Sequence, residues 1–429
     1  MIKTLWLCNV LIPEAAQILG KTYRPVGGWL SGALNALLLY PNNITISLVC
    51  PSDSDLCRKG DDFTLYTFFN NIDNTKYNPK LKDVFVKILQ NATPDVIHIW
   101  GSEFPHSLSM IEAAEQCGLA NRTIIHIQGL MHIYEKHYFA NLPLRIRYGF
   151  SFRDIIKRNN VYLAKKYAAK RGKYEIEALR RTYAVAGRTN WDRACTFLVN
   201  DKVKYYHCRE VLRDCFYTGS WEYEKCNKHQ IFFSQPVGIV KSFYQLLKVF
   251  PDVLSRYPDA RIVTTGNLVP KTFLARFMQS CFHRYMYKII KKNRLEHAID
   301  FRGNMSAEEM KEAYLSSNVF ISTSSIENSP NSLGEAMLLG VPCISSDVGG
   351  TNQMLCADEE GFIYPFDEEY MLLWYILKVF QEEDQLSSLS EKAKIHAQHN
   401  QSKEGFVNDI LQMYKSVISN EKDCNTHTR

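Results

Sequence analysis

Residues 319–350 read VFISTSSIENSPNSLGEAMLLGVPCISSDVGG and carry most of the information in this chain. An apolar run that ends at Ser322 has the composition of a buried strand, and a polar loop with Glu327 follows it. Pro330 is expected near the start of a helix, where its fixed φ is tolerated and its missing N–H costs nothing. Gly340 is expected to end that helix, because glycine is favoured just after a helix C-terminus. A second apolar run follows, so the segment predicts a strand–helix–strand unit of a parallel sheet.

The chemistry of this segment suits an anionic ligand. The N-terminus of the predicted helix, around Asn331, Ser332 and Leu333, has free backbone amides and the positive end of the helix dipole. Such a terminus suits a diphosphate. Glu335 lies about one turn inside the helix, where a carboxylate can accept hydrogen bonds from ribose hydroxyls, and Glu327 faces another part of the same ligand. An ordinary explanation also exists, because a carboxylate near a helix N-terminus can simply complement the dipole, and Ser-Pro-Asn is common in turns.

The rest of the chain repeats the same pattern. Short apolar runs alternate with segments of helical spacing, which predicts βαβ units and parallel sheets covered by helices. Strands are expected at residues 5–12, 44–50, 96–100, 123–128, 183–186, 231–234, 261–265, 298–301, 319–322 and 342–345, and helices at 28–40 and 104–116. The fold class is therefore α/β with two Rossmann-like domains, and ligands are expected beyond the carboxyl ends of the strands, in a cleft between two facing sheets.

The domain boundary is expected where the alternation lapses, between Tyr217 and Gln230. Residues 1–218 should form the N-terminal domain and residues 219–395 the C-terminal domain. A C-terminal helix at 396–419 is expected to complete the first domain, and the polar residues 420–429 are expected to fray.

Composition bounds the class of protein. The chain has 429 residues, of which 46% are hydrophobic and 22% charged, as in a folded globular protein. No apolar stretch approaches the roughly 18 residues of a membrane span. Residues 1–12 imitate a signal peptide, but Asn9 interrupts the apolar run and no small-residue cleavage site follows, so a buried first strand is expected. The twelve cysteines are scattered singly, so we expect reduced thiols in a cytoplasmic protein, and neither a disulfide framework nor a zinc site.

The net charge of +6 is distributed unevenly. Residues 145–181 hold twelve Lys or Arg and three acids, and residues 271–294 hold seven Lys or Arg and no acid. The remaining chain is acidic, which indicates an anionic partner at defined places. In 145–181 the cations are interleaved with aromatic and aliphatic residues, as in basic amphipathic helices that bind anionic membrane surfaces. We therefore expect peripheral contact of 145–181 with an anionic membrane; a solvated helix is the plain alternative.

Residues 327–351 resemble the signature of the retaining GT-B glycosyltransferases of family 4, which transfer a sugar from a nucleotide-diphosphate donor. The positions that agree are Glu327, Glu335, Ala336, Met337, Gly340, Pro342, Ile344, Asp347, Gly349, Gly350 and Thr351. Weaker agreement covers nearly the whole chain. The segment 27–30 resembles the family's glycine loop after the first strand, and Lys241 resembles the lysine that neutralises the donor phosphates. The segments 95–99 and 187–189 resemble strand ends of the N-terminal domain.

The resemblance implies roles for these residues. Glu327 is similar to the carboxylate that contacts the transferred sugar, and Lys241 to the cation at the donor phosphates, so these two are the candidate catalytic residues. The implied donor-binding residues supply a ribose ligand, backbone amides and close backbone approach. They are Glu335, Ser332, Leu333, Gly27, Gly28, Gly349, Gly350 and Thr351. Taken alone, the two glycines at 27 and 28 are equally an ordinary strand–helix turn, and a lysine such as Lys241 at the start of a helix is more often simply solvated.

The chain departs from the family pattern in two places. Family members often have a Gly-Arg pair shortly before the lysine, where this chain has Ser234-Gln235, so the second phosphate cation is absent or is supplied by Arg188 or Arg302. The position of the family's histidine near the acceptor holds Gln128. The acceptor-side candidates are therefore His126, with His98 and His106 as alternatives, and Glu103.

The resemblance implies transfer with retention by front-face attack, in which the leaving diphosphate takes the acceptor proton, without a cofactor or metal. Asp53-Ser54-Asp55 spells a D-x-D metal motif, but acidic residues are common in turns. The implied substrates are a nucleotide-diphosphate sugar and a glycan or lipid-linked acceptor, in capsular, exopolysaccharide or lipopolysaccharide synthesis at the inner face of the cell membrane. The alternatives are a GT-B nucleotide-sugar epimerase and a nucleic-acid-binding protein. No aromatic RNA-binding motif, helix-turn-helix signal or zinc pattern supports the second alternative.

Overall fold

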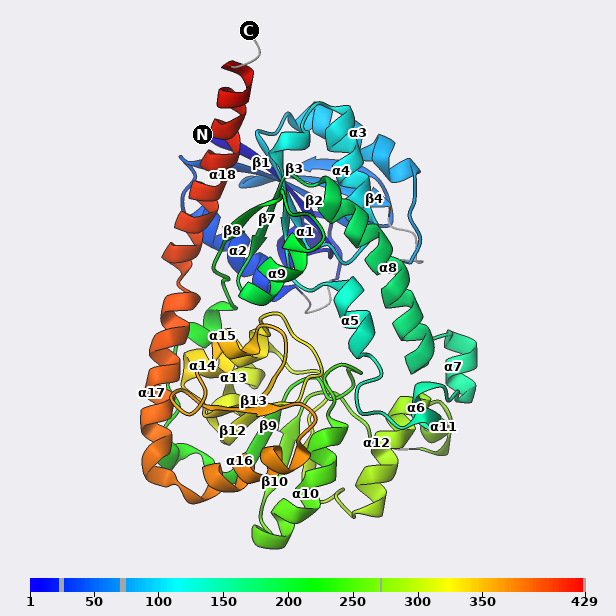
Figure 1. Cartoon of the computed structure of the whole chain (residues 1–429), viewed down its shortest axis with the longest axis vertical. Coiled ribbons are helices and arrows are strands. Elements are labelled where there is room, and N and C mark those ends of the chain that lie inside the picture. Colours follow the sequence, from blue (N-terminus) through cyan, green and yellow to red (C-terminus); the bar gives the residue numbers. More distant parts are fainter. Residues whose placement is uncertain (23–26, 70–74, 271, 427–429) are drawn as a thin grey trace. The chain divides into compact units, whose positions relative to one another are not determined.

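The computed structural model describes residues 1–22, 27–69, 75–270 and 272–426 (Figure 1). These residues form two compact units, each with its own sheet. The first unit consists of Met1–Glu135, Tyr167–Arg213 and the residues from Asn400 onward, and the second consists of Lys136–Lys166 and Asp214–His399. The segment 136–166, expected in the N-terminal domain, thus belongs to the second unit, because its helices pack on that unit.

The described residues of the first unit form an eight-stranded sheet in the order β3-β4-β2-β1-β5-β6-β7-β8. Neighbouring strands are parallel, except for the antiparallel pair β3 and β4. The strands are β1 (Ile2–Cys8), β2 (Ile44–Ser52), β3 (Leu56–Lys59), β4 (Phe63–Phe69), β5 (Val96–Trp100), β6 (Thr123–His126), β7 (Ala184–Gly187) and β8 (Lys204–His207). The helices are α1 (Pro13–Ile18), α2 (Gly28–Leu38), α3 (Lys80–Ala92), α4 (His106–Gln116), η1 (Ala120–Arg122), α9 (Asn190–Phe197) and α18 (Lys403–Thr426), together with most of α5 (Met131–His137) and α8 (Val161–Arg181).

The central strands of this sheet are almost continuously apolar. Every residue of β5, β6 and β7 is buried, as expected for parallel strands that helices cover on both faces. The register pairs Trp100, the last residue of β5, with His126, the last residue of β6. Side chains that can make hydrogen bonds therefore meet at the carboxyl edge of the sheet, where a ligand site is expected in such folds.

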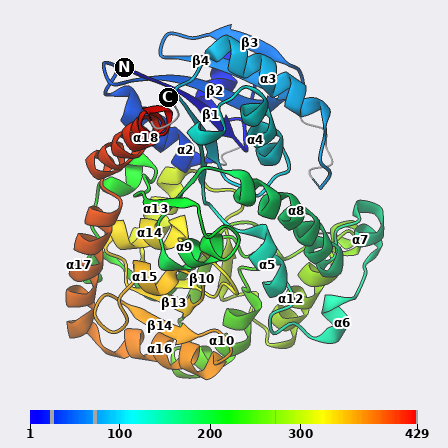
Figure 2. The ribbon, with the colours of Figure 1, turned by 45° about the horizontal axis from the view of Figure 1, so that its top comes forward.

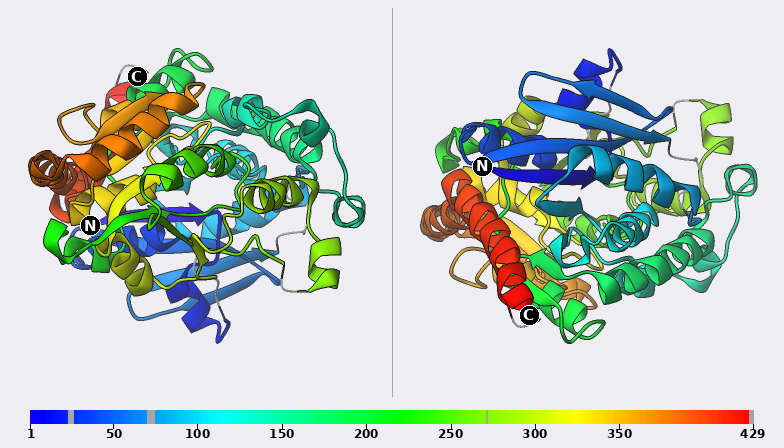
Figure 3. Two further views of the ribbon diagram at one scale, coloured as in Figure 1. Left: turned by 90° about the horizontal axis from the view of Figure 1, so that it is seen from below. Right: turned by 90° about the horizontal axis from the view of Figure 1, so that it is seen from above.

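The C-terminal helix α18 belongs to the first unit and lies beside its N-terminal strand (Figure 3). Tyr414 of α18 is fully buried, and its hydroxyl accepts a hydrogen bond from Trp6 Nε1 at 2.9 Å. The same hydroxyl lies 2.6 Å from His98 Nδ1. The tyrosine oxygen accepts from the indole N–H and shares a second hydrogen bond with the His98 ring. This buried network fastens α18 to β1 and β5.

The described residues of the second unit form a six-stranded parallel sheet in the order β11-β10-β9-β12-β13-β14. The strands are β9 (Asn227–Phe233), β10 (Arg261–Thr264), β11 (Ile299–Phe301), β12 (Ser317–Ser322), β13 (Cys343–Asp347) and β14 (Phe362–Pro365). The helices are α6 (Leu144–Arg147), α7 (Phe152–Lys157), η2 (Asp214–Tyr217), η3 (Tyr223–Lys225), α10 (Tyr244–Arg256), α11 (Phe273–Phe277), α12 (Cys281–Lys292), α13 (Ala307–Leu315), α14 (Asn331–Leu339), α15 (Thr351–Met354), α16 (Glu369–Gln381) and α17 (Glu383–Asn400).

Helices α10 and α16 lie side by side in this unit (Figure 2). Lys248 of α10 pairs with Glu369 of α16 at 2.6 Å, and the Gln245 side chain donates to the Phe366 carbonyl at 2.9 Å. The parallel pairing of β9 with β12 brings the carboxyl ends of these strands to one edge of the sheet. The loops that follow them, which carry Lys241 and Glu327, begin at this edge.

The structure confirms the α/β class, the parallel sheets and each of the strands expected from the sequence, with shifted ends. The sequence did not indicate β3, β4, β8 or β14; β3, for example, is an edge strand with four exposed residues and therefore has no apolar pattern. Helix α18 continues to Thr426, so the tail expected to fray from Asn420 begins as helix, and residues 427–429 lie outside the described residues. No helix among the residues described is long and apolar enough to cross a bilayer.

The network at Tyr414 gives a stability prediction. Tyr414→Phe should lower the free energy of unfolding by about 2–3 kcal/mol, because Trp6 Nε1 and His98 Nδ1 would remain buried without a partner. The neighbouring exposed residue Lys415 gives a matched control, because Lys415→Ala should change the free energy of unfolding by less than about 0.5 kcal/mol. Urea unfolding followed by circular dichroism measures both; equal midpoints for Tyr414→Phe and the wild type would show that the network does not fasten α18.

Candidate active site

The helix that follows β12 begins and ends as the sequence predicts. Pro330 is the residue just before α14, with extended backbone angles, and the first helical residue is Asn331. Gly340 ends α14 in the left-handed conformation, with φ 76°. A side chain at that position would be strained, so the glycine fixes where the helix stops. The N-terminus of α14 is thereby held at the carboxyl edge of the second unit's sheet.

The amides at this helix start are only partly occupied. The Leu333 amide donates to the Pro330 carbonyl at 3.0 Å. The amides of Asn331 and Ser332 have no acceptor among the residues that the structure describes. Of the two amides expected to face a diphosphate, that of Ser332 is therefore available, whereas that of Leu333 already has a partner. The Leu333 side chain is fully buried and anchors the helix.

Glu335 lies in α14 with only 4% of its surface exposed. One partner of its carboxylate is Tyr314 of α13, whose hydroxyl lies 3.4 Å from Glu335 Oε2. The same hydroxyl donates to the Ser332 carbonyl at 2.9 Å. Tyr314, which the sequence did not single out, thus connects the buried carboxylate to the first turn of the helix.

Glu327 lies in the loop between β12 and α14 and is 7% exposed. Its Oε1 atom lies 2.5 Å from Lys241 Nζ and accepts a hydrogen bond from Ser324 Oγ at 2.7 Å. Lys241 comes from the turn before α10, so the ion pair joins the two loops that leave the neighbouring strands β9 and β12. The two candidate catalytic residues are therefore in direct contact.

A run of buried hydroxyl side chains supports this contact. The hydroxyl of Thr323 donates to the carbonyl of Lys241 at 3.0 Å, and the Ser325 amide donates to the carbonyl of Val240 at 2.7 Å. Ser346 of β13 donates to the Ser324 carbonyl at 2.6 Å. The sequence motifs did not indicate these residues, although three small hydroxyl residues directly after a buried strand, Thr323, Ser324 and Ser325, are an unusual signal.

The backbone of Glu327 is held by the glycines after β13. The Gly350 amide donates to the Glu327 carbonyl at 3.1 Å. Gly349 has φ 57°, and a Cβ atom there would lie 1.8 Å from the Glu327 carbonyl oxygen. Only glycine allows this approach. Thr351 has a different place: its side chain is fully buried and donates to the Ser346 carbonyl at 2.9 Å, so it stabilises the loop.

Gly27 and Gly28 belong to the first unit and open α2; residues 23–26 before them lie outside the described residues. Gly27 has φ 78°, and a Cβ atom there would lie 2.7 Å from the Val10 side chain. A Cβ atom on Gly28 would lie 2.8 Å from the Arg213 side chain. Packing within the first unit therefore already requires small residues at both positions.

His126 ends a chain of buried hydrogen bonds that begins at Tyr414. His98 Nε2 lies 3.2 Å from His126 Nδ1, and both imidazoles are buried. Burial lowers the pKa of His98 to about 3 and that of His126 well below its usual value, so both rings are neutral near pH 7. Each neutral ring carries one proton, so a single proton lies between His98 Nε2 and His126 Nδ1 and the tautomers of the two rings are coupled. The Nε2 atom of His126 has no hydrogen-bond partner among the residues described.

Glu103 lies in the loop after β5 and accepts a hydrogen bond from Asn9 Nδ2 at 2.8 Å. Burial raises its pKa to about 7, and the neighbouring carboxylate of Glu175 adds to the rise. His106, the other candidate of this loop, lies 2.7 Å from the Asn9 side-chain oxygen. Burial lowers its pKa to about 3. The first unit thus holds a carboxyl group that titrates near neutral pH.

The two arginines considered for the donor phosphates both have acidic partners. Arg188 of the first unit lies 3.1 Å from Glu210, and Arg302 of the second unit donates to Asp300 at 2.9 Å. Gln235, which stands where the family often has arginine, is exposed and takes φ 57°. Lys241 is therefore the cation in direct contact with the candidate site of the second unit.

The acidic residues of the D-x-D motif have partners within the first unit. Asp53 pairs with Lys21, and Asp55 accepts a hydrogen bond from the Phe69 amide at 2.6 Å. Elsewhere in the described ranges, the ligand atoms of Cys356, Glu360 and His396 lie within 4.8 Å of one another. Hydrogen bonds account for that group, because Glu360 Oε2 accepts from the Cys356 amide at 2.9 Å and lies 2.7 Å from His396 Nδ1.

Residues 222–396 match the family model of the glycosyl transferases group 1. The matched segment contains Lys241, Glu327, Glu335 and the glycines that hold the Glu327 loop. A sequence search of curated proteins found no match.

The whole chain resembles solved glycosyltransferase structures. Sucrose-phosphate synthase from Thermosynechococcus elongatus has a TM-score of 0.68 at 13% identity, over 98% of this chain and 100% of that one. Anabaena HepE in complex with UDP and glucose has a TM-score of 0.65 at 13% identity, over 97% and 100%. An α,α-trehalose-phosphate synthase (UDP-forming) from Burkholderia vietnamiensis has a TM-score of 0.64 at 9% identity, over 98% of both chains. The protein has the GT-B fold.

The close approach at Gly349 gives a second prediction. Gly349→Ala should lower the free energy of unfolding by more than the roughly 1 kcal/mol that a left-handed residue costs, because the new Cβ must also displace the Glu327 carbonyl. Gly303→Ala is the matched control, since Gly303 has φ 73° with nothing within 4 Å of its Cβ position. Urea unfolding compares the two variants. If both variants lose the same free energy of unfolding, the Glu327 loop moves aside without a measurable cost, and Gly349 does not hold Glu327 in place.

Proposed function

We propose that this protein is a retaining GT-B glycosyltransferase of family 4, which transfers a sugar from a nucleotide-diphosphate donor to a glycan or lipid-linked acceptor. The observation that carries the proposal is the start of α14, where open amides lie between two buried acids, one of them paired with Lys241. The match of residues 222–396 to the group 1 glycosyltransferases supports it. UDP-sugars are the first donors to test, because one structural relative is in complex with UDP and another is described as UDP-forming.

In the proposed reaction the leaving diphosphate takes the proton of the acceptor hydroxyl, and the sugar is attacked on the face that the diphosphate leaves. The charge that develops on the phosphates would be stabilised by the Ser332 amide, the dipole of α14 and Lys241. Lys241 is 2.5 Å from Glu327 without a donor, so an incoming diphosphate would compete with Glu327 for this cation. Glu335 would bind the ribose, and Gly27, Gly28, Gly349 and Gly350 would allow close backbone approach. No metal or cofactor is required in this proposal.

On the acceptor side we propose His126 and Glu103 of the first unit. The Nε2 atom of His126, which has no partner among the residues described, can form a hydrogen bond with the acceptor hydroxyl. Glu103, with a pKa of about 7, can exchange a proton near neutral pH. We further propose that the segment 145–181 contacts an anionic membrane at the cytoplasmic face, which fits a role in capsular, exopolysaccharide or lipopolysaccharide synthesis.

Donor identity and reaction class can be tested together. UDP-, GDP- and ADP-sugars are compared by thermal shift in buffer with EDTA, and the one that stabilises the protein is incubated with and without candidate acceptors. Transfer to an acceptor with retained anomeric configuration, undiminished by EDTA, is the expected result. Conversion of the donor into an isomeric nucleotide sugar without any acceptor would instead identify an epimerase. Loss of turnover in EDTA would show that the reaction needs a divalent metal ion.

The two acids should have different effects. Glu335→Ala should weaken donor binding by about 10- to 100-fold, the value of hydrogen bonds to a charged group, whereas Glu327→Ala should lower kcat by about 100-fold or more. Donor affinity should survive in Glu327→Ala, because Lys241 is then free for the diphosphate. Calorimetry and initial rates separate the two effects, with Glu308→Ala on the exposed start of α13 as the control. Equal changes of both variants in donor dissociation constant alone would contradict this division of roles.

A further inference from the structure

The first part of the basic segment 145–181, up to Lys166, meets the basic residues of 272–294 in the second unit. Helices α6 and α7 of segment 136–166 lie beside α11 and α12 (Figure 1). The rings of Phe152 and Phe277 are 4.9 Å apart, and Asp154 accepts a hydrogen bond from the Cys281 amide at 2.7 Å. Gly149 also packs on Cys281, since a Cβ atom there would lie 2.7 Å from its sulfur. Segments far apart in the chain therefore form one continuous surface.

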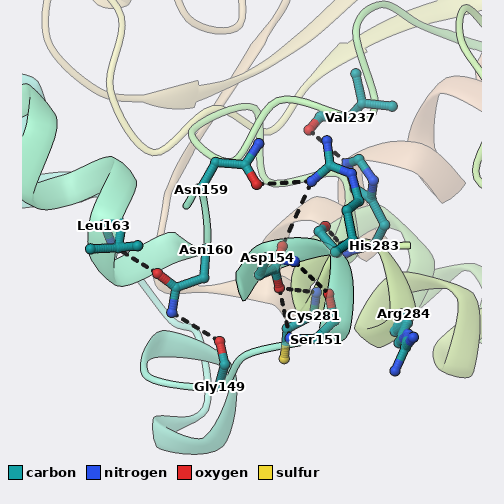
Figure 4. Close-up of polar contacts among 12 residues, drawn as sticks. Gly149, Ser151, Asp154, Asn159, Asn160, Leu163, Val237, Cys281, His283 and Arg284 are labelled. Atoms are coloured by element: carbon teal, nitrogen blue, oxygen red, sulfur yellow. Dashed lines mark hydrogen bonds and ion pairs between the residues drawn. The ribbon is translucent and has the colours of Figure 1, made fainter. Parts of the chain in front are cut away.

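The single acid of α6, α7 and their loops is already used within this surface. Asp154 is fully buried and forms a capping box with Ser151 in addition to its bond to Cys281 (Figure 4). Arg153 lies 3.7 Å from it. Residues 272–294 contain no acid at all. The other cations of the surface thus have little local neutralisation, which leaves a strongly positive field.

Large apolar side chains project from the same helices. Phe273 and Leu274 of α11 are 85% and 68% exposed, and Ile155 and Ile156 of α7 are 64% and 54% exposed. Soluble proteins rarely leave such a set of aromatic and aliphatic side chains in water without a partner. We define these four residues, with Arg276, Arg284 and Lys288, as the basic–apolar face.

A pocket opens within this face, between α11 and α12. It encloses about 260 Å³, and its lining includes Phe273, Phe277, Arg276, Arg284 and Lys288. Arg276 and Lys288 have no acidic partner among the residues described. Arg284 donates to the Phe277 carbonyl, which orients its guanidinium. Its Nε atom is buried without an acceptor in the described part of the chain, and Figure 4 shows the side chain extending away from the Asp154 network.

The chemistry of this pocket fits a phosphate ester. Three cations line it, and a guanidinium that is oriented by its bond to the Phe277 carbonyl suits phosphate oxygens. The exposed apolar side chains beside it suit the acyl boundary below a lipid headgroup, where aromatic and aliphatic residues insert while cations contact the phosphates. A nucleic acid would leave Leu274, Ile155 and Ile156 in water, and so it accounts for only the charge.

We propose that the pocket between α11 and α12 binds the phosphate headgroup of an anionic membrane phospholipid, with Phe273 and Leu274 inserted beside it. The proposal deepens the membrane contact proposed above and rests on it, but moves its centre from the segment 145–181 to the basic–apolar face. Arg145, Arg284 and Lys288 all lie near enough to Cys281 to counter the rise in its thiol pKa that burial causes, so cations of both segments act on one place.

Sedimentation with vesicles tests the charge. The full chain should sediment with phosphatidylcholine vesicles that contain phosphatidylglycerol, and not with phosphatidylcholine alone. Arg276→Gln/Lys288→Gln should weaken this binding roughly fivefold for each cation removed, hence about 25-fold. Lys87→Gln/Lys202→Gln removes two exposed cations of the first unit and should have little effect. No preference for anionic vesicles, or equal losses in the two double variants, would overturn the proposal.

Two further variants test the pocket and the apolar insertion. Arg284→Lys keeps the charge but loses the oriented fork, and should weaken vesicle binding at least about fivefold. Millimolar sn-glycerol 3-phosphate should displace the wild-type protein more than sodium chloride of equal ionic strength, a readout that does not depend on any variant folding. Phe273→Ser/Leu274→Ser should weaken binding without changing its salt dependence. If Arg284→Lys binds vesicles as the wild type does, and glycerol phosphate does not displace the protein, then vesicle binding depends on the positive charge of the face alone. That result would overturn the headgroup site.

The outcome is separable from that of the proposed glycosyl transfer. Donor turnover with a soluble acceptor should be the same for all these variants, since none lies in the donor or acceptor machinery. Vesicle binding without any sugar transfer would support the headgroup site and contradict the proposed glycosyl transfer. Sugar transfer without vesicle binding would support the proposed transfer and contradict the headgroup site. If the protein binds a single-stranded oligonucleotide more tightly than anionic vesicles at equal salt, the partner of the basic–apolar face is a nucleic acid, and the lipid proposal is wrong.

Discussion

The ion pair between Lys241 and Glu327 is the contact on which the candidate site depends. It joins the loops after β9 and β12, which neighbour each other only because the sheet is parallel and both strands end at the same edge. A lysine beside a carboxylate with little exposed surface is costly to desolvate unless further hydrogen bonds complete it. Ser324 supplies one such bond to the carboxylate, and Thr323 ties down the backbone of Lys241. The small hydroxyl residues therefore act as a scaffold that keeps the charged pair in one geometry.

The candidate site residues of the second unit lie close together because their loops all begin at this edge of the sheet. The Glu327 loop and the start of α14 form the connection after β12, and the glycines form the connection after β13, where Gly350 donates to the Glu327 carbonyl. Pro330 and Gly340 set the ends of the helix, Tyr314 connects its first turn to Glu335, and Gly349 leaves room for the Glu327 carbonyl. Gly340 and Gly349 have positive φ values that favour glycine, and at Gly349 a Cβ atom would also meet the Glu327 carbonyl, which is why a short motif could carry so much information.

Sequence patterns predicted the parts of the molecule that local physics controls. The helix limits at 330 and 340 follow from proline and glycine geometry, and the buried strands follow from continuous apolar runs. Edge strand β3 has no such run, and the assignment of segment 136–166 to the second unit depends on contacts such as Phe152 with Phe277, which no local pattern contains. In the site, the family resemblance indicated Glu327, Glu335 and Lys241, but it did not indicate that Lys241 pairs with Glu327. Tyr314 lies in another helix, and its contact with Glu335 exists only after the sheet has formed.

The buried series Trp6, Tyr414, His98 and His126 links the C-terminal helix to the end of β6. Each neutral imidazole carries one proton, so the position of the proton on His98 fixes its position on His126. A tyrosine near the opposite end of the polypeptide is therefore one of the groups that set the tautomer of a side chain at the end of β6. A chain cut before residue 403 would remove this partner of His98, and the proton positions of both rings would no longer depend on the C-terminal helix.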